Sequence, residues 1–281
     1  MRLSTDRHDR DGAGLVHVYP VLSRRSGGVS VGVNLNPDKA CNFRCVYCQV
    51  EGLVRGKPEP VDERLLEEEL RGFLEGLLRG DTRLEGLPPG AHRPKDVAFS
   101  GDGEPTSSPN FERAVSLVAR VMDEFELRPH TRLVLITNGS LVGREEVARG
   151  IAKLGEPNGE VWFKLDSATD AGLARINDFA GGIERAYARL AACARLSRTF
   201  VQTCVFATDG RPPGEDERAA YLELLRRAVR ENLGLAGVQL YGLARRVRQP
   251  DARRVGRLDA NWLEALAVEI EGVGLPVVTK P

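Results

Sequence analysis

The sequence predicts an α/β fold in which parallel strands form a partial (β/α)6 barrel, and three observations support that prediction. Six short runs are rich in apolar and β-branched residues, helical patterns lie between them, and the two kinds of segment alternate along the chain. Such alternation is typical of parallel sheets whose strands are joined by crossover helices. Six units are too few for a complete eightfold barrel. A doubly wound open sheet is the second interpretation.

The expected strands are nearly continuous in apolar residues, as strands buried on both faces are. The first of them, "VSVGVNL", directly precedes a loop rich in cysteine. Together the six runs cover residues 29–35, 96–101, 132–138, 160–166, 199–207 and 236–243.

The expected helices carry apolar residues along one face. Leucines recur at helical spacing after Asp62, and Ser108 with Pro109 predicts the N-cap and first residue of the next helix. Further helices are expected near 144–154, 183–196, 215–232 and 259–271. We divide the chain into an N-terminal extension, residues 1–28, and a barrel with a C-terminal extension, residues 29–281.

The composition is that of an ordinary globular protein, with 42% hydrophobic and 28% charged residues. Forty basic residues balance forty acidic ones, so an anionic partner must be met by a local patch. No apolar run approaches a membrane span, and the first residues, "MRLSTDRHDRDG", lack the apolar core of a secretory signal. We therefore expect the protein in the cytoplasm, where clustered cysteines indicate a metal site more than disulfides.

Three of the five cysteines lie in the stretch "NPDKACNFRCVYCQVEG", at Cys41, Cys45 and Cys48. The stretch follows the first strand, so it lies at a carboxyl end, where function gathers in such folds. Three thiolates can bind three corners of a [4Fe–4S] cluster, which normally takes four cysteines, and one iron is then open to an outside ligand. A Cys3His zinc site is the alternative. Its histidine would come from His8, His17, His92 or His130.

The cysteine stretch resembles the signature of the radical S-adenosylmethionine (radical SAM) superfamily, C-x3-C-x-aromatic-C, with Tyr47 in the aromatic place. The resemblance implies a partial barrel of the radical SAM type, a [4Fe–4S] cluster on the three cysteines, and SAM on the open iron. It also implies that the reduced cluster cleaves SAM to a 5′-deoxyadenosyl radical, which abstracts hydrogen from a substrate. A flavodoxin or ferredoxin is then implied as the electron donor.

Two further motifs follow strands, as the resemblance requires. The stretch "FSGDGEPT" is similar to the family's G-G-E-P motif, which binds the amino group of SAM, so Gly103, Glu104 and Pro105 are assigned to cofactor binding. The third strand ends in "TNG", which is similar to a motif at that position in many members and adds Asn138 to the same group. The resemblance also implies that Tyr47 flanks the adenine through its backbone.

The fourth strand carries "FKLD", in which Lys164 and Asp166 point to one side of the strand. The two side chains either pair with each other or lie in the barrel mouth near SAM or the substrate. We take them as candidate catalytic residues, and Asn177, at the end of "ARIN", as a lesser candidate.

The remaining cysteines are expected to be buried core residues rather than ligands of a second cluster. Cys193 fits a helix beside Leu190, and Cys204 lies on the fifth strand among phenylalanines. Gln202, on the same strand face as Cys204, is expected to line the barrel.

The order of the motifs between about residues 20 and 246 resembles the wyosine-base-type Fe–S oxidoreductase branch, which is named for archaeal members that build a tricyclic base in tRNA. The resemblance implies a tRNA base as substrate. The tRNA-modifying members carry further cysteines for another cluster, whereas no cysteine precedes Cys41 here. A glycyl-radical activating enzyme, acting on a protein substrate, and a non-catalytic Fe–S or zinc-binding module are the alternatives.

The stretch "ARRVRQPDARRVGR" follows the sixth strand and holds six arginines between Arg245 and Arg257. At a carboxyl end these arginines could meet phosphate in the barrel mouth. Pairing with nearby acids on a solvated loop is the alternative, and we favour it slightly. The stretch contains no aromatic residue that would stack on a base.

Overall fold

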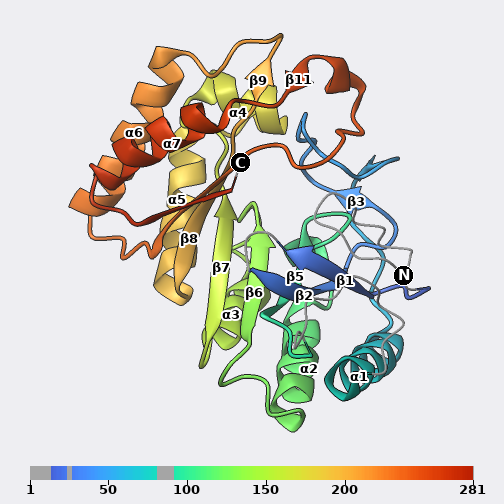
Figure 1. Ribbon diagram of the computed structural model, residues 1–281. Coiled ribbons are helices and arrows are strands. Elements are labelled where there is room, and N and C mark those ends of the chain that lie inside the picture. The colour runs from blue at the N-terminus through green and yellow to red at the C-terminus, as the bar shows by residue number, and fades with distance from the viewer. Residues whose placement is uncertain (1–13, 24–26, 81–91, 281) are drawn as a thin grey trace.

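The computed structural model describes residues 14–23, 27–80 and 92–280, and its centre is a curled sheet that forms a half-barrel (Figure 1). The eight strands of this sheet are β1 (Val18–Ser23), β2 (Gly28–Val33), β5 (Asp96–Phe99), β6 (Arg132–Thr137), β7 (Gly159–Lys164), β8 (Thr199–Cys204), β10 (Gly237–Tyr241) and β12 (Val277–Lys280). Their order is β1-β2-β5-β6-β7-β8-β10-β12. β1 pairs antiparallel with β2, and the other neighbours pair in parallel.

The predicted fold class is therefore confirmed. The six predicted strands correspond to β2, β5, β6, β7, β8 and β10. Two strands that were not predicted, β1 and β12, form the edges of the sheet by pairing with β2 and β10.

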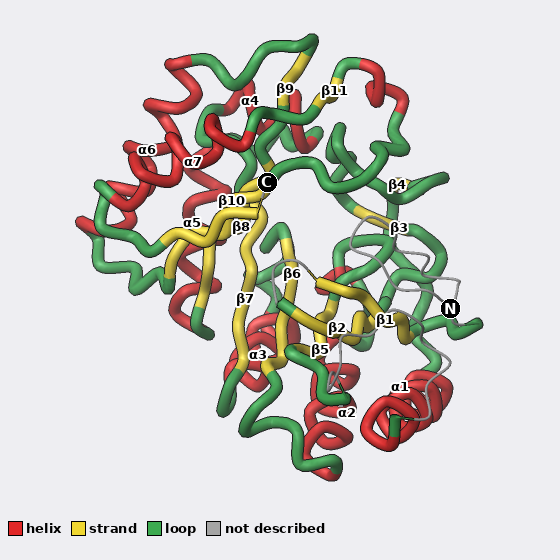
Figure 2. Tube along the Cα trace, viewed as in Figure 1, coloured by secondary structure: helices red, strands yellow, loops and turns green. Residues whose placement is uncertain are grey.

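Helices cover the outer face of the sheet (Figure 2). They are α1 (Glu63–Arg79), α2 (Phe111–Glu124), α3 (Glu145–Gly155), α4 (Asp170–Asn177), α5 (Ile183–Leu196), α6 (Glu215–Arg230) and α7 (Ala260–Glu271). The main hydrophobic core lies between these helices and the strands. On β7, for example, Val161 and Phe163 belong to that core, whereas Trp162 and Lys164 line a cavity on the inner face. The alternation of the strand thus separates packing from function.

The sequence determines the two ends of α1 through its caps. The Asp62 side chain accepts a hydrogen bond from the Leu65 backbone N–H at 3.0 Å, which satisfies a donor of the first turn. Gly80 ends the helix in the left-handed region, with φ of 76°. The predicted helix after Asp62 is confirmed.

The predicted start of the next helix was wrong. Pro105–Ser107 form a short 3-10 turn, η2, and α2 begins only at Phe111, after Asn110. Ser108 cannot act as the cap because its hydroxyl donates to the Asn110 side chain at 3.1 Å. That Asn110 side chain also accepts the Val61 N–H at 3.1 Å, so the polar pair joins two loops.

Two small sheets lie at the carboxyl end of the half-barrel. β3 (Ala40–Cys41) pairs with β4 (Val54–Arg55), and β9 (Ala207–Thr208) pairs with β11 (Val255–Gly256). They hold the long loops that follow β2, β8 and β10. In the part of the chain that the structure describes, no helix is long and apolar enough to cross a membrane.

Candidate metal and cofactor site

The three clustered cysteines line one cavity at the carboxyl ends of the strands. They belong to the cysteine loop, residues 36–52, which follows β2. Pairing of β3 with β4 fixes the loop at Cys41, and the Cys48 N–H donates to the Cys45 carbonyl at 2.9 Å. The spacing of the three cysteines therefore allows a turn that directs their thiols toward one cavity.

Burial raises the pKa of the Cys41 thiol to about 11, and burial raises the pKa of Cys45 above the usual range as well. The Asn177 amide donates to Cys45 Sγ at 3.2 Å and acts in the opposite direction. Thiolates in such a setting need a nearby positive charge, which a metal supplies.

A cluster and a single ion place different demands on the arrangement of their donors. A zinc ion needs donors that converge on one point, whereas a four-iron cluster takes one thiolate on each iron. Among the residues that the structure describes, no three His, Cys, Asp or Glu side chains converge on a single-ion site. Three separate thiols around one cavity suit the cluster.

The histidines of the zinc alternative lie elsewhere where the structure describes them. No histidine is among the described residues that line the cavity. His17 is buried and its Nδ1 contacts the Asn34 carbonyl at 3.0 Å, and His92 lies beside Gly80 at the end of α1. His130 is exposed in the turn before β6, and His8 lies outside the described residues.

Glu104 is a buried carboxylate beside the cysteines, 4% exposed. Its Oε1 accepts from the hydroxyls of Thr106 and Thr137 at 2.6 and 2.5 Å, and its Oε2 accepts from the Asn138 N–H at 2.8 Å. Burial raises the pKa of Glu104, although these hydrogen bonds act in the opposite direction. A cationic group placed at Oε2 would therefore favour the ionised form.

The loop that carries Glu104 lies close to the cysteine loop. A Cβ on Gly103 would overlap the Ala40 carbonyl oxygen, so only glycine allows this approach. Asp102 lines the cavity and accepts from the Asn34 amide at 2.7 Å. Pro105 is buried at the start of η2 and is not among the residues lining the cavity, so its contribution is to the turn that supports Glu104.

Asn138 directly follows β6 and contacts Glu104 through its backbone N–H. Its side-chain amide donates to Asn42 Oδ1 at 2.9 Å, and Asn42 lies between Cys41 and Cys45. The asparagine thus links the end of β6 to the cysteine loop, and it lines the cavity with Glu104.

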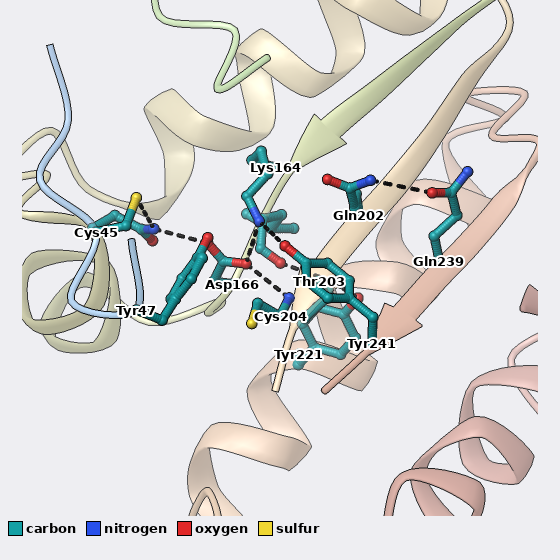
Figure 3. A network of polar contacts seen from close by, with 12 residues as sticks. Cys45, Tyr47, Lys164, Asp166, Gln202, Thr203, Cys204, Tyr221, Gln239 and Tyr241 are labelled. Atoms are coloured by element: carbon teal, nitrogen blue, oxygen red, sulfur yellow. Dashed lines mark hydrogen bonds and ion pairs between the residues drawn. The ribbon is translucent and has the colours of Figure 1, made fainter. Parts of the chain in front are cut away.

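Lys164 and Asp166 meet in a polar network beside Cys45 and Tyr47 of the cysteine loop (Figure 3). Asp166 Oδ1 lies 3.2 Å from Lys164 Nζ and accepts the Cys204 backbone N–H at 2.9 Å. Asp166 Oδ2 accepts the Tyr47 hydroxyl at 2.5 Å and the Asn177 amide at 2.8 Å. The carboxylate side chain is fully buried. The two predicted residues therefore pair with each other, and Asp166 orients residues of the cysteine loop.

Lys164 itself faces the cavity. Its ammonium donates to the Tyr241 hydroxyl at 2.5 Å and lies 4.9 Å from the centre of the Tyr47 ring. Burial is the largest single influence and would lower the pKa of Lys164, but Asp166, Tyr241 and Cys204 act together in the opposite direction and the pKa is raised. The ammonium stays charged, so a fixed positive charge lines the cavity.

Gln202 lies next to Lys164 on the inner face of the sheet, because the register of β7 and β8 pairs the two residues. Gln202 is fully buried and lines the cavity, as predicted. Its amide nitrogen donates to Gln239 at 3.2 Å, whereas its Oε1 has no hydrogen-bond partner among the described residues. Trp162 lines the same region. A buried acceptor without a donor is costly unless a ligand or water completes it.

The comparison with protein families decides the relationship. A family model described as the Radical SAM superfamily matches residues 35–225, which is more than half of the chain. This chain belongs to the radical SAM superfamily. Members of the superfamily are catalysts that generally use a [4Fe–4S] cluster and SAM, and the predicted relationship is confirmed.

Curated relatives of this radical SAM protein match over about half of its length. A UPF0026 protein of Methanocaldococcus jannaschii is 30% identical over 151 residues, which are 54% of this chain and 40% of that protein. A UPF0026 protein of Helicobacter pylori is 30% identical over 135 residues, covering 47% and 37%. A GTPase Obg of Brachyspira hyodysenteriae is 26% identical over 128 residues, 46% of this chain and 16% of that protein.

Solved structures share the fold. A radical SAM methyltransferase from Sphaerobacter thermophilus is similar with a TM-score of 0.58 and 16% identity, over 93% of this chain and 68% of that chain. Archaeal TYW1 is similar with a TM-score of 0.51 and 15% identity, over 91% of this chain and 83% of that chain. A spore photoproduct lyase with bound AdoMet and dinucleoside spore photoproduct gives 0.59 and 10%, over 89% and 75%.

The residues of this chain fit the two cofactors of the superfamily. Three thiols surround one cavity, a buried carboxylate with acceptor capacity at Oε2 lies beside them, and Gly103 leaves room for close approach. Sequence reasoning missed some polar partners of this site. They are Asn34, Asn42 and Tyr241. The run "NLN" after the first strand and the alternation of "VQLY" are the signals that would have found Asn34 and Tyr241.

Proposed function

We propose that this protein binds a [4Fe–4S] cluster through Cys41, Cys45 and Cys48, and SAM beside Glu104, and catalyses a radical reaction. When bound, the cluster and SAM supply a 5′-deoxyadenosyl radical that abstracts hydrogen from a substrate. The observation that supports the proposal most is the single cavity that these cysteines share with Glu104 and Lys164.

The chain's own residues would divide the work by position. Glu104 Oε2 would accept a hydrogen bond from the ammonium of SAM. Within the described residues it accepts one hydrogen bond, from the Asn138 N–H, and a carboxylate oxygen can accept a second. Asn138 and the backbone of Tyr47 would shape the adjoining wall. Asn177 would hold Cys45 in place through its 3.2 Å contact with the sulfur.

The substrate would enter the inner face of the half-barrel next to Lys164. Two of the three ammonium donors of Lys164 are used by Asp166 and Tyr241, so the third would meet a carbonyl or anionic oxygen of the substrate. Gln202 Oε1 would accept an N–H or O–H from the substrate, because the protein leaves it without a donor in the described part of the chain. Lys164 would then be the residue that contacts the substrate, and Asp166 would be the residue that positions Lys164.

A tRNA base is the substrate we propose, on the order of motifs shared with the wyosine-base-type branch. The fold also occurs in a spore photoproduct lyase that was solved with a dinucleoside photoproduct. Retention on tRNA that weakens steeply with salt would support this substrate. Hydrogen abstraction from a protein glycine without tRNA retention would favour the activating-enzyme alternative instead.

The reaction class is tested by anaerobic reconstitution with iron and sulfide, followed by dithionite and SAM. We expect 5′-deoxyadenosine from the wild type and none from a triple Cys→Ala variant of the loop at residues 41, 45 and 48. Cys193→Ala is the matched control, because Cys193 is buried on α5 and is not among the residues that line the cavity. Protein that carries zinc and yields no 5′-deoxyadenosine would overturn the proposal in favour of a non-catalytic module.

A further inference from the structure

The stretch of arginines after β10 lies directly against the cysteine loop. We define the arginine segment as residues 244–257, which run beside the cysteine loop in Figure 1. The Arg248 N–H donates to the Cys48 carbonyl at 3.0 Å, and the Gln249 amide donates to the Val50 carbonyl at 2.8 Å. Arg245 also contacts Gln49 at 3.3 Å. Residues about 200 positions apart in the sequence thus form one surface over the candidate cluster.

The charge of this segment is large for a chain whose net charge is zero. It carries six arginines and one aspartate. Part of the expectation of local pairing holds, because Arg254 contacts Asp209 at 2.8 Å and Arg257 donates to the Ala244 carbonyl at 2.9 Å. Not every arginine of the segment is paired in this way, so the segment keeps a positively charged surface.

Two arginines define that surface. Arg246 and Arg253 are exposed, and neither has an ion-pair or hydrogen-bond partner within the residues that the structure describes. Arg248 is only loosely paired, with 3.9 Å to Glu51. Exposed cations that are not held in ion pairs lower the potential energy of an approaching anionic surface and raise its association rate.

Two kinds of anionic macromolecule could use this surface, and the structure favours one. Single-stranded nucleic acid is bound by cations interleaved with exposed aromatic rings, and the arginine segment contains no aromatic residue. The aromatic residues packed beneath it, Tyr47 and Phe206, are buried. A folded acidic protein needs only complementary charge beside the cysteine loop.

We propose that the arginine segment is the docking surface for an acidic protein that donates single electrons, of the flavodoxin or ferredoxin class. The proposal rests on the proposed function, because only a redox cluster at the cysteine loop gives such a partner a role. In the step concerned, the donor protein loses one electron and the cluster gains it, and no bond is formed or broken. The backbone contact between Arg248 and Cys48 places the docked partner next to a cluster ligand.

The test compares two reductants on the reconstituted full chain with SAM. Dithionite is small and needs no docking surface, whereas reduced flavodoxin does. In Arg246→Glu/Arg253→Glu we expect flavodoxin-supported 5′-deoxyadenosine formation to fall about tenfold at low salt, with the dithionite-supported rate unchanged. The control Arg64→Glu/Arg226→Glu makes the same charge change on α1 and α6 and should keep both rates.

A second readout does not depend on turnover. Calorimetric titration of oxidised flavodoxin should give a Kd about tenfold higher for the segment variant than for the wild type, and the wild-type Kd should rise with salt. An unchanged Kd and an unchanged flavodoxin-supported rate would overturn the proposal. Loss of tRNA retention with flavodoxin binding intact would also overturn it and assign the segment to nucleic acid.

The two proposals fail in different ways. If dithionite produces no 5′-deoxyadenosine with the wild type, the proposed function fails, and the titration still reports whether flavodoxin binds at the segment. If dithionite succeeds and the segment variant behaves as the wild type with flavodoxin, only the docking surface is wrong.

Discussion

Replacing Asp166 by asparagine removes a buried charge from the centre of a network with four donors. The donors are Lys164, Tyr47, Asn177 and the backbone of Cys204. Asparagine offers one acceptor oxygen where aspartate offers two, and its amide N–H2 would face donors. Lys164 would be left as a largely buried cation, since its side chain is 16% exposed. Breaking a buried pair in this way costs about 3–5 kcal/mol.

For a chain of this size the cost corresponds to a fall in melting temperature of about 5–9 °C. Thermal unfolding of the cofactor-free protein, followed by circular dichroism and calorimetry, measures it for Asp166→Asn. Lys164→Met should cost less, about 1–3 kcal/mol, because Asp166 keeps three neutral donors. The double variant should cost less than the sum of the two, because neither buried charge is then unpaired.

The reasoning would be refuted if the free-energy costs of Asp166→Asn and Lys164→Met added up to the cost of the double variant. It would also be refuted by a melting temperature for Asp166→Asn within about 2 °C of the wild type. Either result would mean that Asp166 does not carry the charge balance of Lys164 in the folded protein.

Two further variants test local geometry and charge. Gly103→Ala should destabilise the protein by about 1–3 kcal/mol and reduce the iron bound after reconstitution, because the new Cβ overlaps the Ala40 carbonyl; Gly56→Ala, which meets no neighbouring atom, should do neither. Glu67 has its pKa lowered to about 2, chiefly by a hydrogen bond from Arg120. Its contribution is therefore present above the ordinary carboxyl pKa and lost as the pH falls through about 2. Urea unfolding of Glu67→Gln should give a loss of about 0.5–1 kcal/mol at pH 7 that disappears at low pH.

The strands and most helices followed from the sequence because their signals are local. Continuous apolar runs mark strands buried on two faces, and the cap at Asp62 fixes where α1 begins. The start of α2 was missed because Ser108 is engaged with Asn110, a contact that depends on the loop before α1. The strand β1 was not predicted because Pro20 interrupts its apolar run, and proline within a run argues against a strand unless that strand lies at a sheet edge.

The motif residues of the site could also be predicted, because spacing brings them to the strand ends. The contacts that these residues make with distant partners could not be predicted. Asn177 reaches Cys45 across 132 positions, and Tyr241 reaches Lys164 across 77. Such contacts depend on strand register and on how far the sheet curls, and neither quantity is encoded in a short stretch of sequence.

The choice between pairing and catalysis for Lys164 and Asp166 illustrates the limit further. The sequence places both on one side of β7, and it offers pairing and function as alternatives. In the structure these are not exclusive, since Asp166 neutralises Lys164 and in the same contacts orients Tyr47. A buried ion pair is rarely a gain in stability by itself. Here the pair lies between the cysteine loop and Gln202, and it keeps one fixed cation on the wall of the cavity.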